Sequence, residues 1–248
     1  SAAIGIAEDI TRAKEMADLN SQNAKENIYL FDSRGLVVKG RDHLTPNKEQ
    51  FAHPIEGETN FIEVVHQLKP TVIIGVAGQP NVFTKAVIEA MANLNDHPII
   101  FALSNPTTKS ECTAEEAYRW SDGKAIFASG SPFDSVEFKG KTFYPGQGNN
   151  AYIFPGLGLG IVISRASRVV DEMLVIAAQT LGEMVSQTDF NEGRLYPPLT
   201  NIREISLKIA TAVAEYVFDN NLAQVPRPEN IEQTIRARAY LPEYISYV

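Results

Sequence analysis

The sequence predicts an α/β fold in which a doubly wound parallel sheet is followed by a helical segment. Up to Phe127, short apolar runs alternate with stretches that have helical spacing. The runs are almost continuous in Val, Ile, Leu, Phe and Ala, which is typical of strands buried on both faces of a parallel sheet. From Ala151 onward, apolar residues recur at every third or fourth position, as they do in helices.

Four strands are expected in the first part of the chain, over residues 27–31, 71–76, 98–103 and 125–127. Helical spacing from Ile6 to Ala17 predicts a helix before the first strand, and an apolar stripe from Val87 to Leu94 predicts another before the third. The pair Thr113 and Glu116 has the spacing of a capping box, and Asn60 with Glu63 is a looser match, so a helix should begin at each. Such alternation indicates βαβ units.

Two long helices are expected over residues 169–185 and 202–217, because their apolar residues share one face. Glycines at every second position from Gly156 to Gly160 favour close helix packing over a phosphate loop. The Pro- and Arg-rich end of the chain suggests an extended tail. We therefore predict a sheet-containing domain over residues 1–149, a helical segment over 150–221 and an extended tail over 222–248.

Composition excludes several classes of protein. The net charge of −8 argues against nucleic-acid binding, which needs a surplus of Lys and Arg on one face. The longest apolar stretch, residues 151–163, contains Pro155 and is too short to cross a bilayer. The single cysteine, Cys112, cannot form an internal disulfide. We expect a cytoplasmic protein without nucleic-acid or membrane partners, with an organelle matrix as the alternative location.

Small and polar residues follow each expected strand, where open α/β sheets bind their ligands. They are Asp32-Ser33-Arg34-Gly35, Ala77-Gly78-Gln79-Pro80, Ser104-Asn105-Pro106 and Ser129-Gly130-Ser131-Pro132. The lack of bulk predicts one crevice lined by backbone groups, in which Ala77 and Gly78 contact a cofactor.

An acid that closes a strand in a Rossmann-like sheet accepts hydrogen bonds from the adenosine ribose, and Asp32 occupies such a position. The alternative is that Asp32 only starts a turn before Gly35. We expect the first strand of the sheet and its Gly-x-Gly loop to precede Ser1. The helix that starts at Ser1 and Ala2 would then donate backbone N–H groups to the pyrophosphate.

Five long motifs, in order, resemble those of the malic enzymes. They are Asp32-Ser33-Arg34-Gly35-Leu36-Val37-Val38-Lys39-Gly40-Arg41, Phe101-Ala102-Leu103-Ser104-Asn105-Pro106-Thr107, Ala128-Ser129-Gly130-Ser131-Pro132-Phe133, Tyr144-Pro145-Gly146-Gln147-Gly148-Asn149-Asn150 and Gly193-Arg194-Leu195-Tyr196-Pro197-Pro198-Leu199. The resemblance implies oxidative decarboxylation of L-malate to pyruvate and CO2 with reduction of NADP or NAD.

The resemblance also implies roles for three asparagines. Asn105 would lie near both the nicotinamide ribose and the malate, and Asn149 would bind malate with Asn150 beside it. An amide donates to a carboxylate and accepts from a hydroxyl without adding charge, which suits this role. Without the family match, both sites would be interpreted as turns.

The choice between NADP and NAD depends on the residues near the second ribose. Asp32 repels a 2′-phosphate unless a cation offsets it. Ser33 and Arg34 follow directly, and Lys48 matches a lysine that pairs with the 2′-phosphate in NADP-dependent malic enzymes. The resemblance therefore favours NADP, although Lys48 could equally be a solvated loop lysine.

The family's catalytic tyrosine and lysine, and the carboxylates that bind Mg²⁺ or Mn²⁺, are expected upstream of Ser1. No catalytic residue or metal ligand is therefore predicted in this chain, and we expect it to be inactive by itself. A malolactic enzyme, which retains NAD while converting malate to lactate, and a non-catalytic dinucleotide-binding module are the alternatives. The resemblance further implies a homo-oligomer, either a dimer or a tetramer.

Overall fold

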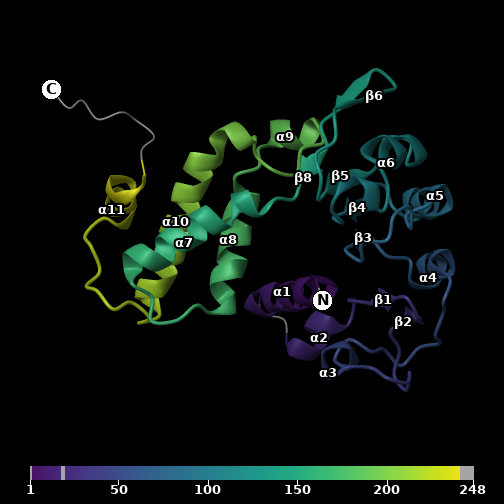
Figure 1. Cartoon of the computed structure of the whole chain (residues 1–248), viewed down its shortest axis with the longest axis horizontal. Coiled ribbons are helices and arrows are strands. Elements are labelled where there is room, and N and C mark those ends of the chain that lie inside the picture. The colour runs from purple at the N-terminus through teal and green to yellow at the C-terminus, as the bar shows by residue number, and fades with distance from the viewer. Residues whose placement is uncertain (1, 18–19, 241–248) are drawn as a thin grey trace. The chain divides into compact units, whose positions relative to one another are not determined.

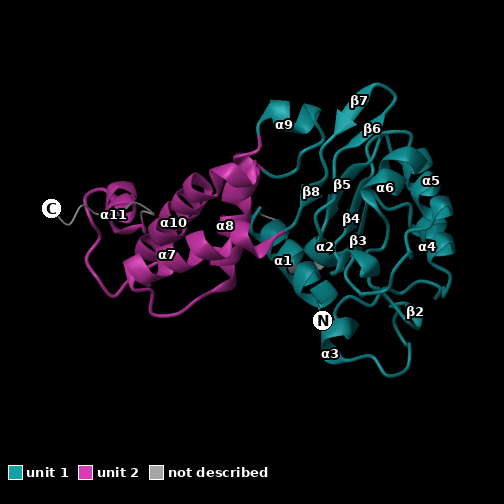
Figure 2. Cartoon of the chain, turned by 45° about the horizontal axis from the view of Figure 1, so that its top comes forward, with its two compact units in different colours: residues 1–148, 186–196 teal, residues 149–185, 197–248 magenta. Residues whose placement is uncertain are grey.

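A computed structural model describes residues 2–17 and 20–240 of the chain. It contains two compact units, one formed by residues 1–148 with 186–196 and the other by residues 149–185 with 197–248 (Figure 2). The first boundary lies next to the predicted one at residue 149. The structure differs in assigning residues 186–196, which we placed in the helical segment, to the first unit.

The first unit is organised around a four-stranded parallel sheet (Figure 1). Its strands are β3 (Val72–Gly75), β4 (Ile99–Ala102), β5 (Ile126–Ser129) and β8 (Gly146–Gln147), and they lie in that order. In the register, Ile73 faces Ile100, and Ile100 faces Phe127. The apolar runs thus predicted β3, β4 and β5, whereas the two-residue strand β8 has no apolar run to reveal it.

Three helices pack against this sheet: α4 (Phe61–Leu68), α5 (Lys85–Leu94) and α6 (Ala114–Trp120). The predicted capping box forms at α6, where the Thr113 hydroxyl accepts from the backbone N–H of Glu116 and the Glu116 carboxylate accepts from that of Thr113. Asn60 caps α4 by accepting from the N–H of Ile62. A hairpin of β6 (Val136–Phe138) and β7 (Lys141–Phe143) completes this core, and the short helices η1 (Thr107–Lys109) and α9 (Gln187–Asn191) also belong to the unit.

The predicted strand over residues 27–31 is wrong as a member of the parallel sheet. Only Phe31 is in a strand, β1 (Phe31–Asp32), which pairs antiparallel with β2 (Gly35–Leu36). The carbonyl of Leu30 accepts from Val37, and that of Ile28 accepts from the ring of His53. These backbone groups therefore find partners within residues 28–53, and the segment does not need a place in the sheet to satisfy them.

A small hydrophobic cluster holds this region together with α1 (Ala2–Met16), and the short helices α2 (Ser21–Lys25) and α3 (Pro46–Glu49) lie along the same stretch of chain. The cluster comprises Ile4, Ala7, Leu30, Val37, Phe51 and Ala52. The helix predicted from Ile6 to Ala17 is confirmed as α1. Leu30, with Ile28 packed beside it, is therefore apolar because it is buried against a helix and a loop.

The second unit is helical, as predicted. Its main helices are α7 (Phe154–Ser164), α8 (Asp171–Glu183) and α10 (Ile202–Asp219), with the short turns η2 (Asn150–Tyr152) and η3 (Leu199–Asn201). A methyl group on Gly156 would lie 2.7 Å from the Cβ of Ile209, and one on Gly160 would lie 2.7 Å from the carbonyl of Ala210. The glycines therefore allow α7 to approach α10 closely, as the sequence suggested.

The tail is not extended throughout, which corrects the prediction for residues 222–248. It contains α11 (Ile231–Arg238), which Asn230 caps by accepting from the N–H of Gln233. Ile231 and Ile235, four residues apart, are buried against Ala210 and Ala214 of α10. Two apolar side chains on one face thus suffice for a short helix that packing stabilises, despite the prolines that precede it.

Candidate functional site

The loops that follow β3, β4 and β5 are joined by side-chain hydrogen bonds. The backbone N–H of Gly78 donates to the Ser104 hydroxyl at 2.9 Å. The Ser131 hydroxyl donates to the amide oxygen of Asn105 at 2.6 Å. Because parallel strands end at one edge of a sheet, these contacts build a continuous rim from residues of three successive loops.

Two glycines keep side chains out of this rim. A methyl group on Gly130 would overlap the backbone carbonyl of Leu103, and one on Gly75 would overlap the side chain of Glu111. Gly78 has φ +67°, which favours glycine. Of the small residues predicted at the strand ends, Gly130 is therefore required by packing and Gly78 by its backbone conformation.

A buried carboxylate, that of Glu111, lies beneath the rim. Its side chain is fully buried and accepts from both the hydroxyl and the backbone N–H of Ser104. The sequence analysis did not identify Glu111. Its position directly before Cys112 and the capping box does not distinguish it from the exposed acid Glu115, so only the structure reveals it.

Asp32 lies at the centre of a second cluster, which we call the Asp32 cluster: Asp32, Arg34, Arg41 and Lys48. The Arg41 guanidinium binds both carboxylate oxygens, with Nη1–Oδ1 at 3.1 Å and Nη2–Oδ2 at 2.7 Å. The Lys48 ammonium forms an ion pair with Oδ2, and the backbone N–H of Arg34 donates to Oδ1 at 2.9 Å. Partial burial raises the pKa of Asp32, but these hydrogen bonds outweigh burial and hold the pKa well below its usual range.

The charges of this cluster sum to a cationic surface, because the side chains of Arg41 and Lys48 both pair with one acid. Arg41 keeps 15% of its side chain exposed and Lys48 keeps 29%. Arg41 also donates to the carbonyls of Gly35 and Leu36, so it ties the turn together. Lys48 is the more accessible of these two cations and the better placed to meet an incoming anion. Sequence reasoning missed Arg41, which stands nine residues from its acid.

An aromatic row connects the Asp32 cluster to the rim. Phe31, which precedes Asp32, lies 5.1 Å from Phe61 between ring centroids, and Phe61 lies 6.0 Å from Phe83. Phe83 ends the loop after β3, and its backbone N–H donates to the carbonyl of Glu111. The row thus packs the strand of Asp32 against the loop that carries Gly78.

Three other predicted cofactor contacts lie at the protein surface. Ala2 is the first residue of α1 and is exposed, whereas Ser1 lies outside the described residues. Ser33 and Ala77 are exposed on their loops. Asp32 also starts the turn that leads to Gly35, and its role at the adenosine ribose stays a prediction.

Asn149 and Asn150 belong to the second unit, whereas Asn105 belongs to the first. The Asn149 side chain accepts from the N–H of Ala151 at 2.8 Å and so caps η2. Both asparagines are exposed. The joint binding of malate by Asn105 and Asn149 stays a prediction.

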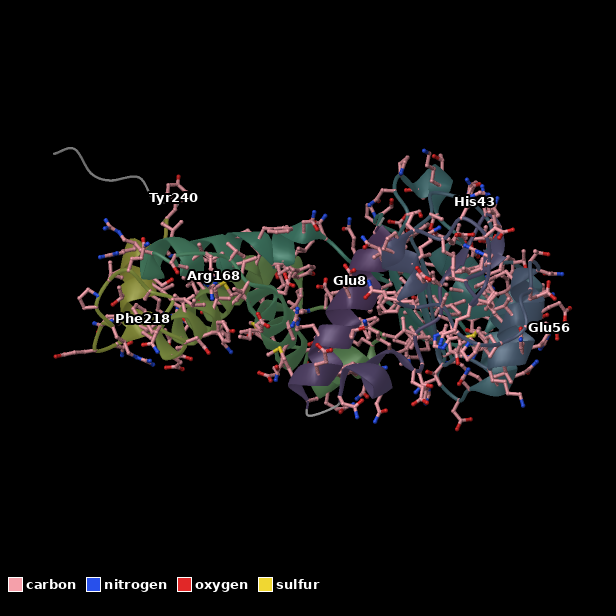
Figure 3. All side chains as sticks on the ribbon, turned by 90° about the horizontal axis from the view of Figure 1, so that it is seen from below. Glu8, His43, Glu56, Arg168, Phe218 and Tyr240 are labelled. Carbon is pink, nitrogen blue, oxygen red and sulfur yellow. The ribbon has the colours of Figure 1, made fainter. Side chains whose placement is uncertain are left out.

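Among the described residues, no group of three or more His, Cys, Asp or Glu side chains is arranged to hold a metal ion. Of the histidines, His43 lies at the surface of the first unit (Figure 3). Within the same residues, every helix is too short or too polar to cross a membrane. Burial and the neighbouring acids Glu116 and Glu111 raise the pKa of Cys112, which makes its thiol a poor nucleophile.

Comparisons with known proteins agree on one family. The family model "Malic enzyme, NAD binding domain" matches residues 1–218. The chain is 48% identical to an NADP-dependent malic enzyme of Dictyostelium discoideum and 51% identical to one of Vitis vinifera, over 98% and 99% of its length. The crystal structure of the Entamoeba histolytica malic enzyme matches 95% of the chain with a TM-score of 0.64 at 20% identity, which shows a shared fold.

The matched proteins are longer than this chain. The chain covers 45% of the Dictyostelium relative, 42% of the Vitis relative and 50% of the Entamoeba structure. It therefore spans half or less of the length of each.

Proposed function

The chain belongs to the malic enzyme family, whose NAD-binding domain it contains, and from this premise we propose that it binds NADP in an enzyme that converts L-malate to pyruvate and CO2. The bound cofactor would accept hydride from malate. The chain's own residues would bind and orient the cofactor and contribute amide groups to the substrate site.

The Asp32 cluster is the observation that supports NADP over NAD. A carboxylate at this position of a dinucleotide site accepts from the ribose hydroxyls of NAD and repels a 2′-phosphate. Here Arg41 and Lys48 together more than neutralise Asp32. Charge-assisted hydrogen bonds from the accessible Lys48 would stabilise the 2′-phosphate.

The rim supports the position proposed for the rest of the cofactor. Gly78 leaves room for a ligand to approach the backbone, and Ala77 adds little bulk. The Asn105 amide oxygen is held by Ser131, so the amide nitrogen is oriented as a donor. We propose that this nitrogen binds the nicotinamide ribose or the malate, with Asn149 and Asn150 contributing to the malate site, and that Ala2 and Ser1 lie near the pyrophosphate.

A divalent metal, Mg²⁺ or Mn²⁺, is part of this proposal, because decarboxylation requires stabilisation of the developing enolate. The described residues offer no group of three or more His, Cys, Asp or Glu side chains that could hold it. Loss of activity of the full-length protein on chelation, with recovery on adding Mn²⁺, tests the requirement.

Turnover of the full-length protein with L-malate tests the proposed reaction. We expect NADPH to accumulate, as measured by its ultraviolet absorbance, together with pyruvate. Lactate formed without net cofactor reduction would instead identify a malolactic enzyme. Cofactor binding without any turnover would identify a non-catalytic module.

We also propose that the full-length protein assembles as a dimer or tetramer and resides in the cytoplasm. Light scattering of the purified protein measures the first, and a single-subunit mass would contradict it. Fractionation of cells measures the second, and recovery in an organelle matrix would contradict it.

A further inference from the structure

Glu111 combines complete burial with a simple set of hydrogen bonds. Its carboxylate accepts two hydrogen bonds from Ser104. The Ser104 hydroxyl donates to Oε1, and the Ser104 backbone N–H donates to Oε2 at 3.3 Å. Burial of a carboxylate costs free energy unless hydrogen bonds compensate it. Packing alone would favour an apolar residue here, so the presence of an acid indicates that its hydrogen bonds have a structural role.

The hydroxyl of Ser104 passes this constraint on to the loop after β3. A serine hydroxyl has one hydrogen, and that of Ser104 is given to Glu111. Its lone pairs are then left for the N–H of Gly78, which donates at 2.9 Å. The carboxylate therefore fixes the direction of the hydrogen bond that holds Gly78.

The backbone around Glu111 holds the other end of the same loop. The N–H of Asn81 donates to the carbonyl of Ser110 at 3.2 Å, and that of Phe83 donates to the carbonyl of Glu111 at 3.1 Å. The loop over residues 77–83 is thus attached to one short segment, directly at its far end and through Ser104 at Gly78.

We propose that Glu111 is a positioning residue for the cofactor, which acts through Ser104 to set the conformation of the loop over residues 77–83. The effect on cofactor rests on the proposed function, whereas the effect on the loop does not. The carboxylate does not touch the cofactor; through Ser104 it keeps the Gly78 N–H bonded within the protein and so holds the loop in place beside the rim.

The test uses Glu111→Gln, Ser104→Ala and the double variant of the full-length protein. Glutamine has nearly the same shape but cannot accept from both donors of Ser104, because one of its terminal atoms is itself a donor. Ser121→Ala is the matched control. Ser121 is also buried, and its hydroxyl likewise accepts from a backbone N–H, that of Ala125 at 3.0 Å, while donating to the carbonyl of Tyr118.

Two readouts separate positioning from general stability. Amide hydrogen exchange over residues 77–83 should accelerate about tenfold in Glu111→Gln and Ser104→Ala, because one hydrogen bond that closes the loop is lost. The NADPH dissociation constant should rise about tenfold, and the double variant should differ little from Ser104→Ala. At saturating cofactor, kcat should change less than twofold. Ser121→Ala should change none of these quantities.

Each outcome decides the inference. Unchanged exchange over residues 77–83, or equal acceleration in Ser121→Ala, would overturn it. If exchange accelerates as expected but the wild-type protein does not bind NADPH, the proposed function fails and the link between Glu111 and the loop stands. If Glu111→Gln does not fold, Ser104→Ala decides alone, since it removes one hydroxyl.

Discussion

The guanidinium of Arg41 binds the carboxylate of Asp32 through two parallel hydrogen bonds, with Nη1–Oδ1 at 3.1 Å and Nη2–Oδ2 at 2.7 Å. An acid at the end of a strand in a dinucleotide-binding fold ordinarily accepts hydrogen bonds from a ribose, whereas Asp32 accepts them from Arg41. The carboxylate is already satisfied within the protein, and Lys48, which pairs with Oδ2, keeps 29% of its side chain exposed. The Asp32 cluster is therefore suited to binding an anion.

Replacing Arg41 should weaken the fold as well as the cofactor site. Arg41→Ala removes the bonds to Asp32 and to the carbonyl of Gly35, which should lower the free energy of unfolding by about 1–3 kcal/mol. Arg41→Lys should rescue only part of this loss, because an ammonium cannot form the two-point contact. Urea unfolding measures both.

Arg119 provides the control for this prediction. It pairs with Glu115 on an exposed helix face, and such pairs contribute at most about 0.5 kcal/mol. A loss in Arg41→Ala no greater than that in Arg119→Ala would contradict the structural role of Arg41.

The Asp32 cluster also predicts how stability depends on pH. Because the pKa of Asp32 in the folded protein is below its unfolded value, the ionised carboxylate stabilises the fold at any pH above the unfolded pKa of about 4. This contribution is lost as the pH falls through the lower, folded pKa. The difference in unfolding free energy between wild type and Asp32→Asn should therefore be constant near neutrality and shrink in acid. A difference that does not vary with pH would show that the charge is unimportant.

The glycines of α7 should respond in opposite directions to the same substitution. Gly156→Ala and Gly160→Ala should each destabilise by about 1–3 kcal/mol, because the new methyl group would meet Ile209 or the Ala210 carbonyl of α10. Gly158→Ala should stabilise by about 0.5–1 kcal/mol, since its methyl group has open space and alanine favours a helix. Thermal unfolding of the three variants would contradict the α7–α10 packing if all shifted alike.

Gly75 and Glu111 should show strong coupling. Gly75→Ala places a methyl group against the Glu111 side chain and should cost about 1–3 kcal/mol. In a Glu111→Ala background the space is free, so the same substitution should cost less. A double-mutant cycle measures this coupling, and additive effects would mean that the two residues do not meet as described.

Much of the fold could be predicted from local patterns. Continuous apolar runs identified β3, β4 and β5, and the spacing of Thr113 and Glu116 identified the start of α6. These predictions are confirmed because burial on both faces of a strand and capping of a helix depend on residues that are close together in the sequence. The glycines at 156 and 160 belong to the same class, because close helix packing requires small residues at regular intervals.

The features that were missed depend on partners distant in the sequence. Leu30 is buried as expected, but the hydrogen-bond partners of Ile28 and Leu30 come from nearby loops and not from the sheet. Ile231 and Ile235 make a helix only because α10 offers an apolar surface.

The same reason explains what sequence reasoning missed at the site. Asp32 and Lys48 were identified, since strand ends and family motifs mark them. Arg41 and Glu111 were not, because each acts through side-chain hydrogen bonds that no local pattern specifies.

The dissociation constants of NADPH and NADH for the full-length protein, measured with and without Lys48→Ala, test the account most directly. Loss of one charge-assisted contact to the 2′-phosphate should weaken NADPH binding about 10–100-fold and change NADH binding less than about twofold. The exposed Lys39→Ala serves as the control for charge and should leave both constants unchanged. Equal weakening of the two cofactors, or no weakening of either, would contradict a 2′-phosphate site at the Asp32 cluster.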